Sequence, residues 1–239
     1  MGEGIDGADD REIDSTGTRF TEAERRAQII SATIETIARH GLGRSLFAQI
    51  ADQAALSSTG LISYHFADRE ALIEQVVTQI HVAMAEAVRA RVAQESTAVG
   101  ALRAFIKGSV AFYAGNRTHT VALLRIMSAA REAGRRTGAA ELARAAELGE
   151  LRELLLRGQR RGEFRWFSPV VMAVTIRQAL DGLLALLRGE PDLDLDGYAH
   201  ELVAIFDLAT RQDTDVPGSR FGMSAPATAP GAGRANQKP

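Results

Sequence analysis

Residues 48–73 of this 239-residue chain read AQIADQAALSSTGLISYHFADREALI, and this stretch decides the fold. Apolar residues recur at the spacing of a helix face on both sides of a polar turn, in the order Ile50, Ala51, Ala54, Leu56, Leu61 and Ile62. Two short helices that share so small a core cross at a fixed angle, as in a helix-turn-helix. We therefore expect short helices at about 47–54 and 58–63, with Ser57 as the N-cap of the second.

Longer helices flank this pair on both sides. Thr21 and Glu24 form a capping box, in which the hydroxyl accepts from a free N–H and the carboxylate reaches back to the N-cap. The helix that begins there ends near Gly41 and Gly43, and Asp68 caps another long helix. The buried stripes of the two helices are predicted at Ile30, Ile34, Ile37, Leu72, Val76, Ile80, Ala83 and Ala87. The N-terminal unit is thus a three-helix unit followed by a long connecting helix.

Helical periodicity continues through the rest of the chain. Proline is absent from the first 168 residues, and no alternating apolar pattern persists over five or more residues. Ser168 followed by Pro169 is a good N-cap and first-turn pair. Further helices are expected near 98–115, 118–134, 139–161, 169–188 and 198–210. These patterns predict an all-α fold of about nine helices.

Composition is typical of a soluble globular protein. The hydrophobic content of 46% suffices for a core, and the chain lacks an uninterrupted apolar run of about 18 residues. Its first residues are acidic where a secretory signal would be basic, so we expect a cytoplasmic protein with no membrane partner. The chain has no cysteine, which excludes disulfides, thiolate metal sites and cysteine nucleophiles.

Both ends of the chain are expected to be disordered. Residues 1–14 carry six acidic residues and a single arginine, and the C-terminal segment is rich in Gly, Ala, Ser, Thr and Pro, so neither repays the entropy lost on ordering. The predicted divisions are an acidic tail at 1–19, a helix-turn-helix domain at 20–80, a helical domain at 81–210, and a second tail at 211–239.

Residues 48–73 resemble the DNA-binding segment of the tetracycline-repressor (TetR) family of transcriptional regulators. The shared features are an Ile-Ala pair, a turn ending in serine, an aromatic-His-Phe triplet, and a basic residue followed by Glu-x-Leu. In this chain they are Ile50, Ala51, Ser57, Tyr64, His65, Phe66, Arg69, Glu70 and Leu72. Ala55 stands where the family usually has glycine, Ser58 where it often has lysine, and the stretch from Ser57 to Tyr64 is one residue longer than the commonest spacing. The resemblance covers about residues 20–80.

The helix-turn-helix and the resemblance both indicate double-stranded DNA as the partner. In this docking geometry the start of the second short helix meets base edges, which places the base-reading window at 57–63. The resemblance implies phosphate contacts by Tyr64 and His65 and, at two helix starts, by Ser45 and Arg69, with Phe66 packed inward. The complete predicted DNA-binding set is Arg25, Arg44, Ser45, Ser57, Ser58, Thr59, Gly60, Ser63, Tyr64, His65 and Arg69.

Charge alone does not indicate a DNA-binding protein. The formal net charge is −2, and six arginines face six carboxylates between Arg19 and Glu70. Glu22 and Glu24 lie in the first turn of a helix, where the helix dipole favours them, so the arginines of the unit remain available for phosphates. A small aromatic core cluster is the alternative interpretation of residues 64–66.

The C-terminal domain is expected to dimerise and to bind an effector. Helices at 169–188 and 198–210 are too apolar for a monomer to cover, and the resemblance implies that they pair with their twins in a four-helix homodimer interface, hence a near-palindromic operator. It also implies a small-molecule effector among the middle helices. The predicted pocket residues are Phe105, Phe112, Tyr113, Met127, Arg131, Trp166, Arg177 and Asp181. Alternatively, Phe105 and Phe112 are plain core, and Arg177 with Asp181 is only an i,i+4 ion pair.

The sequence carries no catalytic signature. Its five histidines are scattered, and it contains no His-Glu-x-x-His, phosphate-binding glycine loop or Gly-x-Ser-x-Gly elbow. We expect no enzymatic activity, cofactor or metal. The expected function is that of a homodimeric repressor released from its operator by a small-molecule effector. The alternative is a helical small-molecule carrier or interaction scaffold that does not bind DNA.

Overall fold

The protein is described by a computed structural model that covers residues 12–13, 19–134, 137–190 and 192–212. These residues form nine helices and a small hairpin, in which β1 (Glu12–Ile13) pairs antiparallel with β2 (Arg19–Phe20). The helices are α1 (Glu22–His40), α2 (Leu46–Gln53), α3 (Gly60–His65), α4 (Arg69–Val92), α5 (Ala98–Gly115), α6 (Arg117–Glu132), α7 (Gly138–Arg160), α8 (Pro169–Gly189) and α9 (Leu195–Thr210). The predicted all-α fold is confirmed. Most of both predicted tails lies outside the described residues.

Side-chain caps set several helix starts. The predicted capping box of Thr21 and Glu24 is present at α1, and the Asp68 carboxylate accepts from the Ala71 N–H at 2.7 Å at the start of α4. Helix α9 begins at Leu195, three residues before the predicted start at 198, because Asp194 accepts from the Gly197 N–H at 3.0 Å. These caps satisfy N–H groups that have no partner within the helix.

The three N-terminal helices share one apolar core. Its fully or nearly fully buried members include Ile29, Ile37, Leu46, Ile50, Ile62 and Phe66. The prediction missed Ile29, which is more buried than Ile30. On α4 the prediction is correct at Leu72, Val76 and Ile80. Further along α4, however, Met84 and Val88 are buried instead of Ala83 and Ala87, because this part of the helix packs against both α5 and α7.

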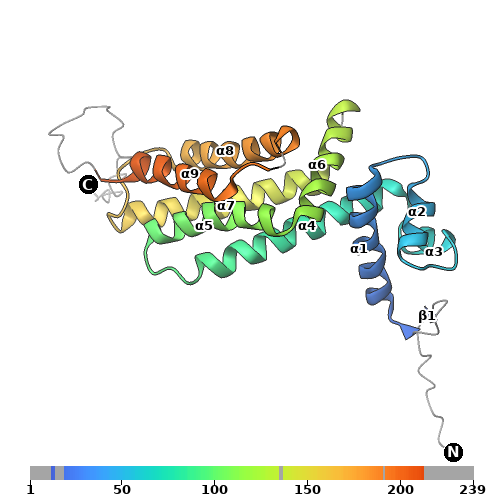
Figure 1. Ribbon diagram of the computed structural model, residues 1–239. Helices are drawn as coiled ribbons and strands as arrows, with labels where there is room; N and C mark the ends of the chain where they lie inside the picture. Colours follow the sequence, from blue (N-terminus) through green and yellow to red (C-terminus); the bar gives the residue numbers. More distant parts are fainter. Residues whose placement is uncertain (1–11, 14–18, 135–136, 191, 213–239) are drawn as a thin grey trace, which may run out of the picture.

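The remaining helices form a bundle beside the N-terminal unit (Figure 1). Helix α4 runs without a break from the N-terminal unit along the bundle, where it packs against α5 and α7. Helix α5 also packs against α9, α7 against α8, and α6 against α1. The N-terminal unit is therefore joined to the bundle in two places, through the continuous helix α4 and through the contact of α1 with α6.

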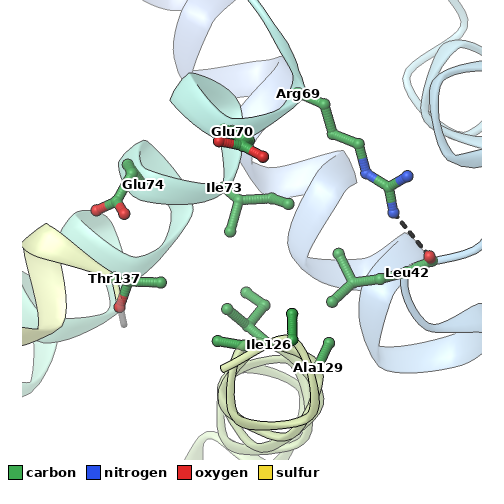
Figure 2. Close-up of a pocket in the computed structure, with 10 residues that line it drawn as sticks. Leu42, Arg69, Glu70, Ile73, Glu74, Ile126, Ala129 and Thr137 are labelled. Carbon is green, nitrogen blue, oxygen red and sulfur yellow. Dashed lines mark hydrogen bonds between the residues drawn. The ribbon is translucent and has the colours of Figure 1, made fainter. Parts of the chain in front are cut away.

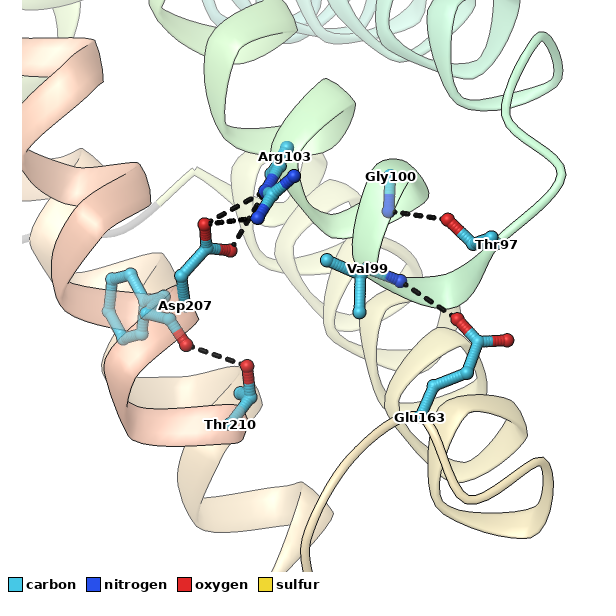
Figure 3. Close-up of polar contacts among 8 residues, drawn as sticks. Thr97, Val99, Gly100, Arg103, Glu163, Asp207 and Thr210 are labelled. Atoms are coloured by element: carbon cyan, nitrogen blue, oxygen red, sulfur yellow. Dashed lines mark hydrogen bonds and ion pairs between the residues drawn. The ribbon is translucent and has the colours of Figure 1, made fainter. Parts of the chain in front are cut away.

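Polar contacts fix the end of the bundle that is distant from the N-terminal unit (Figure 3). The Glu163 carboxylate accepts from the Val99 N–H at 3.2 Å and thereby caps α5 from the α7–α8 connection. On the same helix, Arg103 donates through Nε to Asp207 Oδ2 of α9 at 2.8 Å. These contacts tie α5 to two segments that follow it by more than sixty residues.

Candidate DNA-binding face and ligand cavities

The second short helix begins later than the sequence predicts. Helix α3 starts at Gly60, its N-cap is Thr59 and not Ser57, and the Thr59 side chain makes no capping hydrogen bond. The turn before it contains Ala55 in the left-handed region with φ 52°, at the position where glycine is usual in the resembled family. The later start moves Tyr64 into the last turn of α3 instead of beyond its end.

Most of the predicted DNA-binding residues are exposed on this unit. Gly60, Ser63 and Tyr64 stand at i, i+3 and i+4 and so share one face of α3, while Ile62 on the same helix is buried. Tyr64 is 77% exposed, which is unusual for a tyrosine in a folded unit. Further exposed members of the predicted set are Arg44, Ser45, Ser57, Ser58 and Thr59. The Ser45 hydroxyl makes no capping bond with α2 and is available to a partner.

Two predicted phosphate contacts are contradicted by burial. Arg25 is fully buried, and its Nη1 donates to Gln28 Oε1 at 2.7 Å. His65 is 7% exposed, and its ring packs edge-on against Tyr64 with centroids 5.0 Å apart. Arg69 is half-buried and donates through Nη2 to the Leu42 carbonyl at 2.7 Å, so it links the start of α4 to the α1–α2 connection.

Helix α1 also satisfies the carbonyl ends of the two short helices. Gln28 donates to the Ala54 carbonyl at the end of α2 at 2.9 Å. Arg26 donates through Nη1 to the His65 carbonyl at the end of α3, and its guanidinium lies 4.6 Å from the centre of the Phe66 ring. Polar side chains on α1 thus hold α2 and α3 in place. This role depends on tertiary packing and gives no local signal in the sequence.

A cavity of about 300 Å³ lies where the N-terminal unit meets the bundle (Figure 2). Its wall includes Leu42, Arg69, Ile73 and Ile126, which come from the α1–α2 connection, α4 and α6. Close by on α4, the Glu74 carboxylate accepts from the N–H groups of Gly138 and Ala139 at 3.0 and 2.7 Å and so caps α7. The junction therefore brings together α4, α6 and α7.

Two further cavities lie inside the bundle, on either side of His81 and Glu147. The first, of about 270 Å³, lies between α4 and α7, and Phe105 is part of its wall. The second, of about 250 Å³, is lined by four residues of the predicted effector pocket, Met127, Arg131, Arg177 and Asp181. Since both cavities include His81 and Glu147, they are neighbours across a shared wall.

A cluster of charged side chains extends from this shared wall along the second cavity. Arg177 is 5% exposed and lies between Glu147 (Nε to Oε2, 3.2 Å) and Asp181 (Nη2 to Oδ1, 2.7 Å). Arg144 forms a further ion pair with Asp181. The i,i+4 pair of Arg177 and Asp181 is therefore present, but as part of a larger network.

Burial changes the acidity of the groups around Arg177. It raises the pKa of Tyr113, which lies fully buried beside Arg177, and it also raises the pKa of Glu147. Burial, followed by the positive charge of Arg177, lowers the pKa of His81 to about 4, so His81 is neutral near pH 7. The cluster then holds a neutral imidazole beside paired charges.

Three predicted pocket residues do not line these cavities. Trp166 is 83% exposed on the connection between α7 and α8, and Phe112 is buried in the core. Tyr113 stands behind Arg177 and supports the wall without lining it. The sequence prediction also missed His81, Arg144 and Glu147, because their meeting with Arg177 depends on the packing of α7 against both α4 and α8. In the part of the chain that the structure describes, no cluster of His, Asp or Glu could hold a metal ion.

Comparison with solved structures identifies the architecture. A TetR-family transcriptional regulator from a Rhodococcus species superposes with a TM-score of 0.64 at 23% identity, over 78% of this chain and 98% of that one. The chain has the fold of the TetR-family transcriptional regulators. SmeT, the repressor of the Stenotrophomonas maltophilia multidrug efflux pump SmeDEF, shares this TetR fold with a TM-score of 0.65 at 20% identity, over 84% and 97% of the two chains.

Sequence comparison supports the same relationship over part of the chain. The HTH-type transcriptional regulator BetI of Pseudomonas paraeruginosa is 36% identical over 87 residues, which are 36% of this chain and 44% of that protein. The chain thus matches less than half the length of this TetR-type relative. No protein-family model matches the chain. The resemblance stated from residues 48–73 is confirmed by the TetR fold and by the BetI homologues.

A ligand-bound structure has the same TetR fold. FadR of Bacillus subtilis, solved in complex with stearoyl-CoA, superposes with a TM-score of 0.65 at 19% identity, over 75% of this chain and 96% of that one. At this identity the likeness concerns the fold, so the cavities of the present chain must be judged from its own residues.

Proposed function

We propose that this protein is a cytoplasmic, homodimeric transcriptional repressor that binds a near-palindromic operator through α2 and α3 and is released by a small-molecule effector. In this proposal residues 20–80 form the DNA-binding domain and 81–210 the effector-binding and dimerisation domain, with α4 passing from one to the other. The observation that carries the proposal is the exposed face of α3, on which a bare glycine, a serine and a 77% exposed tyrosine lie beside the buried Ile62.

The chemistry of this face suits DNA. Ser57, Ser58, Thr59 and Ser63 are small hydroxyl side chains that let a helix approach base edges, and Gly60 leaves room for the backbone itself. Tyr64 and Arg44 can reach phosphates on either side, and Ser45 places a helix start beside them. Phosphate contacts would give register, and the residues of α3 would give sequence preference.

Dimerisation is proposed through α8 and α9. These helices are neighbours on one side of the bundle (Figure 1), and the Tyr198 hydroxyl of α9 donates to the Ala179 carbonyl of α8 at 3.1 Å. Their large exposed apolar side chains are Val170, Val171, Val174, Leu186, Ile205 and Leu208. An apolar surface of this kind is stabilised when a second copy covers it. Helix α8 is also long and apolar enough to span a membrane, a property it shares with the core helices of soluble proteins.

A gel-shift titration tests DNA binding directly. We expect the purified dimer to shift the DNA upstream of its own gene at low salt, with affinity falling steeply as salt rises, because phosphate contacts release counterions. A folded dimer that fails to shift this DNA at low salt would leave the alternative, a helical carrier or scaffold without DNA binding.

Two single substitutions test the orientation of α3. Tyr64→Ala should weaken binding to all DNA sequences alike, since we assign this residue to phosphate. Thr59→Ala should change the preference among operator variants instead. If both variants bind every sequence as the wild type does, the face of α3 is not the DNA-binding surface.

A further inference from the structure

A continuous row of cavities follows the contact between α4 and α7. The two cavities that share His81 and Glu147 are followed by a third of about 490 Å³, which has Val88, Phe105 and Ala146 in common with the cavity of about 270 Å³. Small side chains on α7 leave this space open, since alanines or glycine line every part of it.

The middle of the row is apolar and opens to solvent. Its lining includes Met84, Val88, Phe105 and Ala143. Two further apolar residues of this lining, Val82 and Leu142, are 44% and 75% exposed. Exposed leucine and valine at the mouth of an apolar cavity are unfavourable in water and become favourable contacts once an apolar chain enters.

The end of the row at α8 presents polar atoms that the protein leaves unused. Within the described residues, Nη1 of Arg177 and Nε2 of His81 are buried and have no hydrogen-bond partner. A buried donor without a partner is costly, and a ligand acceptor placed there would remove that cost. Arg177 is held by its two carboxylate partners and by a hydrogen bond with the Tyr113 side chain, so its Nη1 is fixed in place for such a contact.

The charges around this end are balanced. Arg144 and Arg177 face Glu147 and Asp181 in close ion pairs. An anionic head group would approach Arg177 beside two carboxylates, and a cationic one would approach it beside two guanidiniums. An uncharged acceptor, such as a carbonyl oxygen, uses the free N–H without either penalty.

We propose that the effector is an uncharged amphipathic molecule whose apolar chain lies between α4 and α7 and whose hydrogen-bond-accepting head group, such as an amide, ester or ketone, lies at Arg177 and His81. The proposal specifies the ligand class of the effector site and in that sense rests on the proposed function. Ligand binding can nevertheless be measured without DNA, so the proposed ligand class and the proposed regulator function can be refuted separately.

Calorimetric titration of the full chain with three probes of equal chain length tests the proposal. Octanamide is uncharged, octanoate is anionic and octylammonium is cationic. We expect octanamide to bind at least about tenfold more tightly than either charged probe, because octanoate and octylammonium would each bring an uncompensated charge into the balanced cluster. Equal or tighter binding of octanoate or octylammonium overturns the proposal, and so does the absence of octanamide binding up to its solubility limit.

Variants locate the chain and the head group. Ala143→Phe fills the apolar cavity and should abolish octanamide binding, whereas Ala114→Phe, at an exposed position of α5 outside the row, should leave it unchanged. Arg177→Lys keeps a charge for both carboxylates but removes Nη1, and should weaken octanamide binding about tenfold. If that variant does not fold, His81→Phe tests the same end. Unchanged octanamide affinity in Ala143→Phe, or in the folded head-group variant, overturns the assignment.

The gel shift separates this inference from the proposed function. Octanamide binding with no DNA shift would sustain the ligand class and refute the regulator. A DNA shift without octanamide binding would sustain the regulator and refute the ligand class.

Discussion

Arg26 provides a direct test of how the DNA-binding unit is held together. In Arg26→Met, the apolar stem remains, but the hydrogen bond to the His65 carbonyl and the contact over the Phe66 ring are lost. A hydrogen bond from a charged donor stabilises by about 1.5–3 kcal/mol and a half-exposed cation–π contact by about 0.5–1 kcal/mol. Because Arg26 is half-buried, we expect a loss of about 2–3 kcal/mol, which lowers the melting temperature by about 4–12 °C.

The effect on DNA binding follows from the position of the lost contacts. Both contacts lie at the C-terminal end of α3, so Arg26→Met should free this helix and weaken operator binding even where the protein is folded. Arg44→Met is the matched control, because Arg44 is exposed. It should change the free energy of unfolding by less than about 0.5 kcal/mol and reduce the salt dependence of DNA binding by about one phosphate contact per subunit.

Thermal unfolding and gel-shift titrations of the two variants and the wild type test whether Arg26 stabilises α3 and supports operator binding. The reasoning is refuted if Arg26→Met keeps both the melting temperature and the operator affinity of the wild type. It is also refuted if Arg44→Met loses as much stability as Arg26→Met, since the contacts of Arg26 would then not be the cause.

Three further predictions concern stability. Gly158→Ala should lower the free energy of unfolding by about 1–2 kcal/mol, because the added Cβ would lie 2.1 Å from a Phe164 ring atom. Gly149→Ala on the same helix is the control. Its Cβ meets nothing within 4 Å, so it should raise the free energy of unfolding by about 1 kcal/mol, and thermal melts measure both changes. Ala55→Gly should raise it by about 0.5–1 kcal/mol by relieving the left-handed conformation, and unchanged or lower stability in urea titrations would contradict this. Since the pKa of His81 is lowered from 6.5 to about 4, the folded state binds fewer protons than the unfolded chain as the pH falls below 6.5. The resulting loss of about 2 kcal/mol at pH 5 should be absent from the urea curves of His81→Phe.

Local signals were sufficient to predict most of the helix boundaries, with α3 and α9 as the exceptions. The capping residues Thr21, Asp68 and Ser168 act within their own first turn, and their helices begin where the sequence indicates. Helix α5 matches its predicted range of 98–115 at both ends for the same reason. Such interactions span only a few residues, so they are visible without knowledge of the tertiary structure.

The candidate sites depend on contacts between distant segments, and there the sequence was a poorer guide. Arg25 and Arg44 look equally suitable for phosphate, and only the packing of α1 on the short helices separates a buried arginine from an exposed one. Trp166 resembled a pocket residue by its chemistry but lies on an exposed connection. His81 and Glu147, which stand at the shared wall of the cavities, meet only because α4 lies beside α7.

Because Glu74 of α4 caps α7, the backbone amides of Gly138 and Ala139 report the position of α4 relative to α7. Their protection against hydrogen exchange depends on a carboxylate carried by α4, the helix that also carries His81 and leads out of the DNA-binding unit. A movement of α4 by little more than the length of a hydrogen bond would expose the Gly138 and Ala139 amides to solvent. Their exchange rates, measured with and without ligand or DNA, would therefore report the position of α4 without any added label.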